Sequence, residues 1–143
     1  KEDQEYILEQ SIVAENKIKK IIDEIKKEFD LKNNQICLSG FSQGCMMSLN
    51  VGLTSEENFL CIVGFSGKII NQNNLKERIK NTTDILLIHG DNDQIVPSTH
   101  LLEAEDFLIR NSVPVQTMMI KNCEHHIPIE ASSTALNYIL KKN

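Results

Sequence analysis

Apolar residues form short unbroken runs that alternate with stretches of helical periodicity. Four such runs predict buried strands, at residues 35–39, 59–65, 84–89 and 114–120. The intervening patterns predict helices over residues 11–30, 45–53 and about 74–80, from Ser98 to Arg110, and from Pro128 to about Leu140. Strands that are apolar throughout and alternate with helices are typical of a parallel sheet covered on both faces. We therefore predict an α/β fold, as a single domain over residues 1–143.

The first predicted helix has two different faces. One face carries apolar side chains at helical spacing, namely Ile18, Ile21, Ile22, Ile25 and Phe29. Lys and Glu fill the other face, which we interpret as a solvated surface.

Composition and charge exclude several classes of protein. Hydrophobic residues make up 41% of the chain and charged residues 24%, which is typical of a folded domain. The net charge of −5 gives no reason to expect nucleic acid as a partner, and no apolar run is long enough for an integral membrane segment. None of the four cysteines has C-x-x-C spacing, so we predict reduced thiols and a cytoplasmic protein; Cys37 and Cys61, inside strand-like runs, are predicted to be small buried side chains.

One motif, G-F-S-Q-G at residues 40–44, stands between a predicted strand and a predicted helix. A strand, a very tight turn and a helix are the parts of a nucleophile elbow, which exposes the hydroxyl of its central serine, here Ser42. Small residues are needed where strand and helix nearly touch, which we take as the reason for Gly40 and Gly44. The backbone N–H of Gln43, at a helix N-terminus, is the predicted oxyanion donor. Without further support, an incidental serine in a glycine turn is an equally good interpretation.

Two loops further along the chain supply an acid and a base in the order that such an elbow requires. Asp91 and Asp93 follow the third predicted strand, and His125 and His126 follow the fourth. A serine hydroxyl needs a neighbouring base, and that base needs a carboxylate to orient it. The residue types alone leave open which Asp and which His take part. His89 is interpreted as a structural hydrogen-bonding residue.

Two other functional hypotheses compete with a serine nucleophile. His89, Asp91, Asp93, His125 and His126 are all suitable metal ligands, so a metal-dependent hydrolase is one alternative. A non-catalytic binding module on the same fold is the other.

Three motifs together resemble the carboxylesterase/phospholipase family of α/β-hydrolases, which includes the acyl-protein thioesterases. They are GFSQG (40–44), HGDNDQIVP (89–97) and EHHI (124–127), and FSG (65–67) also matches a stretch of the family. The resemblance selects Asp93 over Asp91 and His125 over His126. It implies a Ser42–His125–Asp93 triad that cleaves carboxylic esters or thioesters of acyl substrates, among them lysophospholipids or acylated proteins, with no cofactor and no metal.

Apolar residues of the loops are candidate contacts for an acyl chain, although ordinary core packing explains each of them slightly better. They are Ile69, Ile95 and Val96, together with Ile70 and Ile127. The sequence does not indicate an oligomeric state.

The chain departs from the family pattern at three places. Cys45 stands where the family has a glycine after its elbow, which could narrow the space beneath it, and Glu124 replaces the glycine before the histidine. The family also has further strands before the helix at 11–30, and their first loop holds the second oxyanion donor. We therefore expect the sequence to be the C-terminal portion of the domain, with a sheet edge and apolar helix faces left uncovered.

Overall fold

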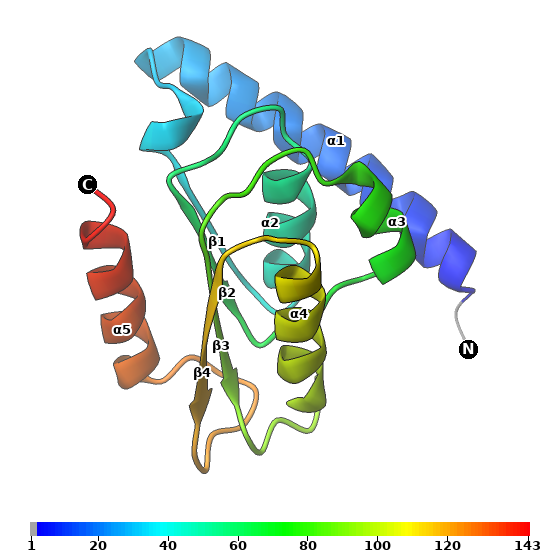
Figure 1. The fold of residues 1–143 in the computed structure, drawn as a ribbon, viewed down its shortest axis with the longest axis vertical. Coiled ribbons are helices and arrows are strands. Elements are labelled where there is room, and N and C mark those ends of the chain that lie inside the picture. Colours follow the sequence, from blue (N-terminus) through cyan, green and yellow to red (C-terminus); the bar gives the residue numbers. More distant parts are fainter. Residues whose placement is uncertain (1–2) are drawn as a thin grey trace.

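The computed structural model describes residues 3–143, which form one sheet flanked by helices (Figure 1). The strands are β1 (Cys37–Phe41), β2 (Cys61–Phe65), β3 (Ile85–Gly90) and β4 (Val115–Ile120). The helices are α1 (Gln4–Phe29), α2 (Gln43–Leu53), α3 (Gln72–Arg78), α4 (Thr99–Arg110) and α5 (Ile129–Leu140), with a 3-10 turn η1 (Asn33–Gln35).

The four strands run parallel in the order β1-β2-β3-β4, as the apolar runs predicted. Their register aligns the carboxyl ends: Phe41 lies beside Phe65, and Gly90 lies beside Ile120. The loops after β1, β3 and β4 therefore leave the sheet at one common edge. In such sheets, functional sites form outside the carboxyl ends of the strands.

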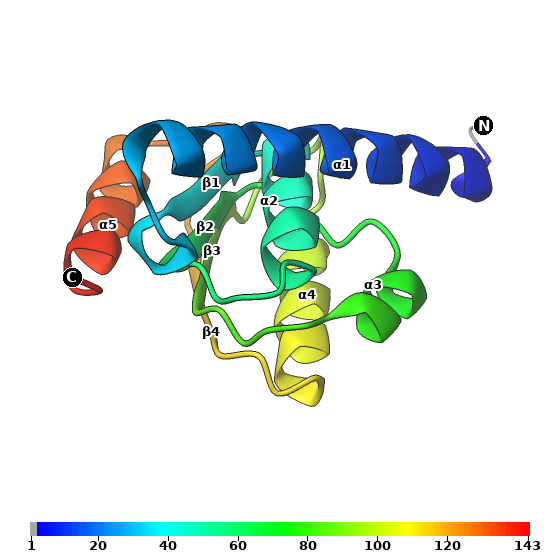
Figure 2. The same ribbon diagram turned by 90° about the horizontal axis from the view of Figure 1, so that it is seen from above.

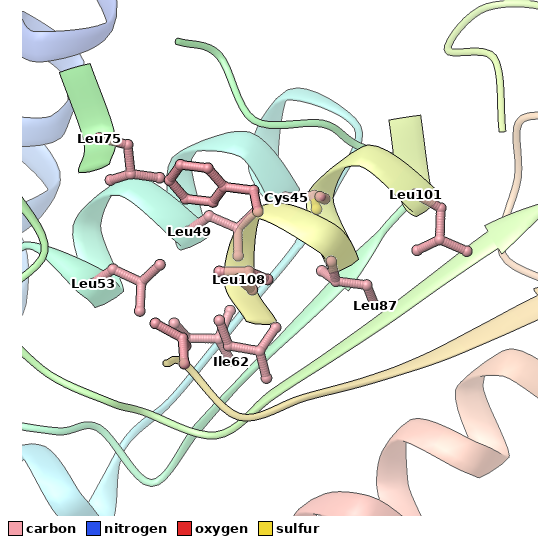
Figure 3. Close-up of a cluster of buried hydrophobic side chains, with 12 residues drawn as sticks. Cys45, Leu49, Leu53, Ile62, Leu75, Leu87, Leu101 and Leu108 are labelled. Carbon is pink, nitrogen blue, oxygen red and sulfur yellow. The ribbon is translucent and has the colours of Figure 1, made fainter. Parts of the chain in front are cut away.

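Helices cover both faces of the sheet, and each face has its own apolar core. In Figures 1 and 2, α2 and α4 lie on one face and α5 lies on the other. The first core joins α2 and α4 to the sheet through Leu49, Ile62, Leu101 and Leu108, among others (Figure 3). The second joins Val63, Leu86 and Ile88 to Ala131 and Ala135 of α5. β2 and β3 are buried along their whole length because both of their faces are covered.

Helix α1 confirms one expectation and corrects another: much of its apolar face is uncovered, but its polar face is not solvated throughout. Its buried residues are Ser11 and Glu15, whereas Ile21, Ile25 and Phe29 are exposed among the described residues. The helix also begins at Gln4 rather than residue 11, because the Asp3 side chain accepts a hydrogen bond from Glu5 N and caps it. Within residues 3–143 no helix combines the length and apolarity needed to span a bilayer.

A buried carboxylate explains why the polar side of α1 is not solvated throughout. Glu15 is 1% exposed and pairs with Arg78 of α3 and, at 3.2 Å, with Lys19. The Thr54 hydroxyl, at the end of α2, donates to the same carboxylate over 3.3 Å. A buried charge requires such partners, so this cluster fixes α1 against α2 and α3.

The β1 edge of the sheet is open, as the sequence analysis expected. β1 pairs with β2 on one side, and within residues 3–143 no strand pairs with its other side. An open groove of about 1520 Å³ follows this edge, between α1, β1, α2 and the segment 68–73. The groove reaches Gln43 and Gly44 at the start of α2.

Candidate active site

The elbow at Ser42 is tighter than the sequence predicted. β1 continues through Gly40 and Phe41, and α2 begins at Gln43, so Ser42 alone forms the turn. Its backbone adopts φ 55° and ψ −113°, a strained conformation for a residue other than glycine. The Ser42 N–H donates to Phe65 O over 2.7 Å, which extends the β1–β2 pairing into the turn and holds the strained residue in place.

The two glycines of the motif do not share one role, which corrects the sequence interpretation. A Cβ added to Gly40 would lie 2.7 Å from Cys45 N and closer still to the Gly44 carbonyl group. A Cβ added to Gly44 would meet no atom of residues 3–143 within 4 Å. Gly40 is therefore the residue that lets the strand touch the helix. Gly44 contributes the backbone carbonyl group that Gly40 touches.

Replacing Gly40 by alanine is expected to destabilise the protein by about 3 kcal/mol or more, because the new methyl group meets main-chain atoms that cannot rotate away. Gly44→Ala is the matched control and is expected to change the free energy of unfolding by less than about 1 kcal/mol, since alanine also favours the helix. Urea unfolding followed by circular dichroism measures both. Equal losses in the two variants would contradict this account of the elbow.

Cys45 occupies the space beneath the elbow without displacing it. The side chain is buried, and it fills the space that a Cβ on Gly64 or Gly67 would need. A Cβ on Gly67 would lie 2.6 Å from both the Cβ and the Sγ of Cys45. Burial raises the pKa of this thiol to about 12, although a backbone hydrogen bond from Gly67 opposes the rise. The cysteine is therefore an inert packing residue beneath the elbow.

The acid loop after β3 and the base loop after β4 are held together by their backbones. Asp91 N donates to Ile120 O and Asn92 N donates to Cys123 O, both over 2.9 Å. Gly90 makes this approach possible, because a Cβ there would lie 2.7 Å from Glu124 O. The two loops thus form one unit above the sheet, and the backbone sets the spacing between their side chains.

The structure brings Ser42, His125 and Asp93 into one hydrogen-bonded chain. His125 Nδ1 lies 2.7 Å from Asp93 Oδ2, and His125 Nε2 lies 3.0 Å from Ser42 Oγ. An ionised carboxylate only accepts hydrogen bonds, so Nδ1 carries the proton and donates it. Nε2 is then free to accept from the Ser42 hydroxyl.

Asp93 is held as an anion by its surroundings. Its side chain is buried, which by itself raises the pKa of the carboxyl group. The hydrogen bond from His125 and those from Val96 N and Ile95 N outweigh burial and lower the pKa below its usual range. Both backbone bonds reach Oδ1 over 2.9 Å, which leaves Oδ2 for the imidazole.

The neighbouring acid and base residues lie outside this chain of hydrogen bonds. Asp91 and His126 are exposed, and His100 pairs with Glu103 on α4. His89 is buried and its Nε2–H donates to Val96 O over 2.8 Å, with Asp93 Oδ2 at 3.4 Å, so it has the structural role that the sequence suggested. Among the described residues, no three His, Cys, Asp or Glu side chains converge in a way that could hold a metal ion.

The apolar residues singled out from the loops lie in different surroundings. Ile95 is 70% exposed beside Asp93, and Ile69 and Ile70 border the groove next to Gln43. Val96 is buried, so its side chain offers little surface to a ligand. Its backbone N–H instead donates a hydrogen bond to Asp93, and its carbonyl oxygen accepts one from His89.

Phe41 is a residue of the site that the sequence analysis missed. Its ring centroid lies 4.7 Å from that of His125, with the two rings tilted by 45°. Phe41 occupies the variable position before Ser42 in the elbow, and an aromatic residue at the carboxyl end of a strand was the available signal. The ring covers one face of the imidazole while the side chain itself stays 38% exposed.

Comparison with known proteins assigns the family. The family model described as Phospholipase/Carboxylesterase matches residues 1–143, the whole chain. The chain belongs to this family. As a member of the phospholipase/carboxylesterase family it has the α/β-hydrolase fold: it superposes on the crystal structure of esterase PE8 with a TM-score of 0.94 and 26% identity, covering 100% of this chain and 66% of that one.

Two curated relatives of this family member show how much of a whole protein it spans. It is 32% identical over 110 residues to acyl-protein thioesterase 1 of Yarrowia lipolytica, covering 71% of this chain and 44% of the relative. It is 28% identical over 119 residues to esterase YpfH of Escherichia coli, covering 80% of this chain and 48% of that relative. The chain therefore spans about half the length of these relatives.

Proposed function

We propose that this protein is a serine hydrolase that cleaves carboxylic ester or thioester bonds of acyl substrates through an acyl-enzyme. The observation that carries the proposal is the hydrogen-bonded chain Ser42–His125–Asp93. Its atoms have the spacing that a nucleophile, its general base and the base's orienting carboxylate require. Family membership and relatives named as thioesterases and esterases support the same reaction class.

In the first half of the proposed reaction, Ser42 Oγ attacks the acyl carbonyl carbon while His125 Nε2 takes the hydroxyl proton. Asp93 stabilises the imidazolium that forms and keeps its ring in place. His125 then donates the proton to the leaving alcohol or thiol, and the acyl group stays on Ser42. In the second half, water attacks the acyl-enzyme with His125 as its base, and the carboxylic acid is released.

The charge that develops on the carbonyl oxygen needs donors placed beforehand. Gln43 N–H stands at the first position of α2, where no carbonyl of the helix is available to it. The partial positive charge at the helix N-terminus adds to its effect. We therefore assign Gln43 N–H as one donor of the oxyanion hole.

The proposed substrates are acyl esters and thioesters, with acylated proteins and lysophospholipids as candidates within that class. The relatives named as acyl-protein thioesterase support the thioester. Ile69 and Ile95 are the proposed acyl contacts, because both have side-chain surface near the elbow or the acid loop. The free cysteines accord with the proposed cytoplasmic location.

The test uses the intact protein, a fluorophosphonate probe and a panel of p-nitrophenyl esters and acyl thioesters of increasing chain length. We expect the probe to attach covalently to Ser42 and the panel to be hydrolysed equally well with and without EDTA. Loss of activity in EDTA would favour the metal-dependent alternative. Failure of the probe to label Ser42, with no turnover of any member of the panel, would favour a non-catalytic module.

Phe41→Ala is expected to lower kcat about 10-fold with little change in KM, because it removes the ring that holds the imidazole rather than a substrate contact. Phe41→Tyr keeps an aromatic ring at the same place and is expected to retain near wild-type kcat. Steady-state kinetics on one ester separates kcat from KM for both variants. A rise in KM at unchanged kcat would make Phe41 a substrate contact instead.

A further inference from the structure

The imidazole of His89 makes polar contacts that core packing alone does not require. His89 lies near the end of β3, and its side chain is 1% exposed. Its Nε2 lies 2.8 Å from Val96 O and 3.4 Å from Asp93 Oδ2. Both oxygens are acceptors, so Nε2 carries a proton, which it donates to Val96 O. One buried N–H group therefore faces the acid loop at two points.

Val96 connects this hydrogen bond to the proposed triad. Val96 N donates to Asp93 Oδ1 over 2.9 Å, while Val96 O, on the other side of the same Cα, accepts from His89. Pro97 follows, and the residue before a proline is largely confined to extended backbone angles. Because so little freedom lies between them, the N–H and the carbonyl group of Val96 turn together. A bond that fixes the carbonyl group therefore also fixes the N–H.

The Asp93 carboxylate depends on this N–H for its orientation. The side chain is fully buried, and Oδ1 accepts from both Ile95 N and Val96 N. These two bonds leave Oδ2 facing His125 Nδ1 at 2.7 Å. A buried acceptor that loses its donor is costly, so without His89 the loop would shift until Val96 O found another partner. That shift would release one of the two bonds that hold Oδ1.

We propose that His89 is a positioning residue of the triad, which holds Val96 and, through it, turns Asp93 Oδ2 toward His125. The inference rests on the proposed serine-hydrolase function and adds a residue to its machinery. The contacts that carry it join β3 to its own following loop and to the base loop. β3 lies between β2 and β4 in the sheet, so these contacts do not involve the open β1 edge.

The first test compares His89→Leu with His89→Gln in the intact protein. Leucine fills similar space without a donor, whereas the glutamine amide carries N–H groups at about the distance of the imidazole Nε2. We expect kcat for a p-nitrophenyl ester to fall about 100-fold in His89→Leu with KM nearly unchanged, the loss that a displacement of about 1 Å can cause. His89→Gln should restore most of this loss.

His100→Leu is the matched control, because His100 is a partly exposed histidine of α4 that pairs with Glu103. Its kcat should equal that of the wild-type protein. Wild-type kcat in His89→Leu, or a loss that glutamine does not restore, would overturn the proposal.

A double variant tests whether His89 acts through Asp93. In Asp93→Asn the carboxylate that His89 positions is already lost. Adding His89→Leu to Asp93→Asn should therefore lower kcat by less than about twofold more, because two residues that act as a unit are not additive. If the two losses multiply instead, His89 acts by another route and the proposal fails.

A third measurement needs no substrate and follows the carboxyl ¹³C signal of Asp93 as the pH is lowered. Burial raises the pKa of Asp93, and hydrogen bonds from His125 and from two backbone N–H groups of the loop bring it below its usual range. The titratable groups that face this carboxylate are His125 and His89, and the Cys123 thiol is close enough to feel its charge. We expect the pKa of Asp93 to rise toward its usual range in His89→Leu and to stay low in His89→Gln. An unchanged titration in His89→Leu would contradict the proposal.

These results separate the inference from the function on which it rests. If the wild-type protein hydrolyses no ester but the Asp93 titration responds to His89→Leu, the proposed function fails while the hold of His89 on Asp93 is supported. A further measurement on the wild-type protein does not depend on any variant folding. Its ¹⁵N NMR spectrum should show His89 protonated at Nε2 at neutral pH, and an unprotonated Nε2 would overturn the proposal.

Discussion

Ser42→Ala is expected to lower ester turnover by about 10⁴-fold or more and to abolish labelling by the fluorophosphonate probe. The reason is that Ser42 Oγ is the atom placed 3.0 Å from His125 Nε2, and alanine leaves that nitrogen with no nucleophile to activate. The rate that remains should reflect binding and oxyanion stabilisation alone. The variant and the wild-type protein are compared on the same p-nitrophenyl ester.

Ser39→Ala is the matched control for this substitution. Ser39 lies on the same strand and is exposed, but it is three residues from the turn and has no part in the triad. We expect its turnover and labelling to match those of the wild-type protein. Circular dichroism of both variants should show the wild-type fold. Full activity in Ser42→Ala would refute the serine mechanism.

Asp93→Asn is expected to reduce kcat by about 10⁴-fold while the fold is kept. Ile95 N and Val96 N both donate to Oδ1, so the asparagine must keep its carbonyl oxygen at that position. The amide NH₂ then takes the place of Oδ2, 2.7 Å from His125 Nδ1. Two donors cannot face each other, so Nδ1 loses its proton to become an acceptor and Nε2 carries it instead. That tautomer cannot take the proton of Ser42.

Asp91→Asn controls for this change, because Asp91 is exposed in the same loop. Its kcat should stay within about twofold of the wild-type value, as is usual for a surface substitution. Equal losses in Asp91→Asn and Asp93→Asn would show that the loop as a whole, rather than the carboxylate facing His125, is responsible.

Asp93→Asn is also expected to change how the free energy of unfolding depends on pH in acid. The fold lowers the pKa of Asp93, so the unfolded state binds more protons between the native pKa and the usual value of about 3.9. The stability due to Asp93 is therefore fully present above about pH 4 and is lost as the pH falls through the native pKa. Asp93→Asn lacks this component, so its free energy of unfolding should fall less steeply with acid than that of the wild-type protein. Urea unfolding across this range measures both slopes.

The sheet was predictable, and its candidate site could be proposed, because their signals are local. An apolar run such as FLCIVGF predicts a strand whose two faces are both covered, as in a parallel sheet. In the structure the strand within this run is buried along its whole length. The elbow motif at a strand end is followed by loops that hold an acid and then a base. This order is recognisable because a serine nucleophile needs residues of those types. The choice of Asp93 and His125 came from the family resemblance. The structure places the two side chains in contact, and their catalytic roles remain our proposal.

Features that depend on distant contacts were not predictable. Glu15 has the sequence context of a surface residue, and its burial depends on partners far along the chain, Arg78 and Thr54. Gly40 and Gly44 are equivalent in the motif, but the direction of their missing side chains differs once strand and helix meet.

The sequence by itself thus determined the order of the elements, the parallel sheet and the three loops that hold chemistry, because periodicity and turn residues act over a few neighbours. The tertiary structure alone decided which side chains meet. It placed Phe41 against His125 and Cys37 against Cys61, since strand register and loop pairing, rather than spacing along the chain, set those distances.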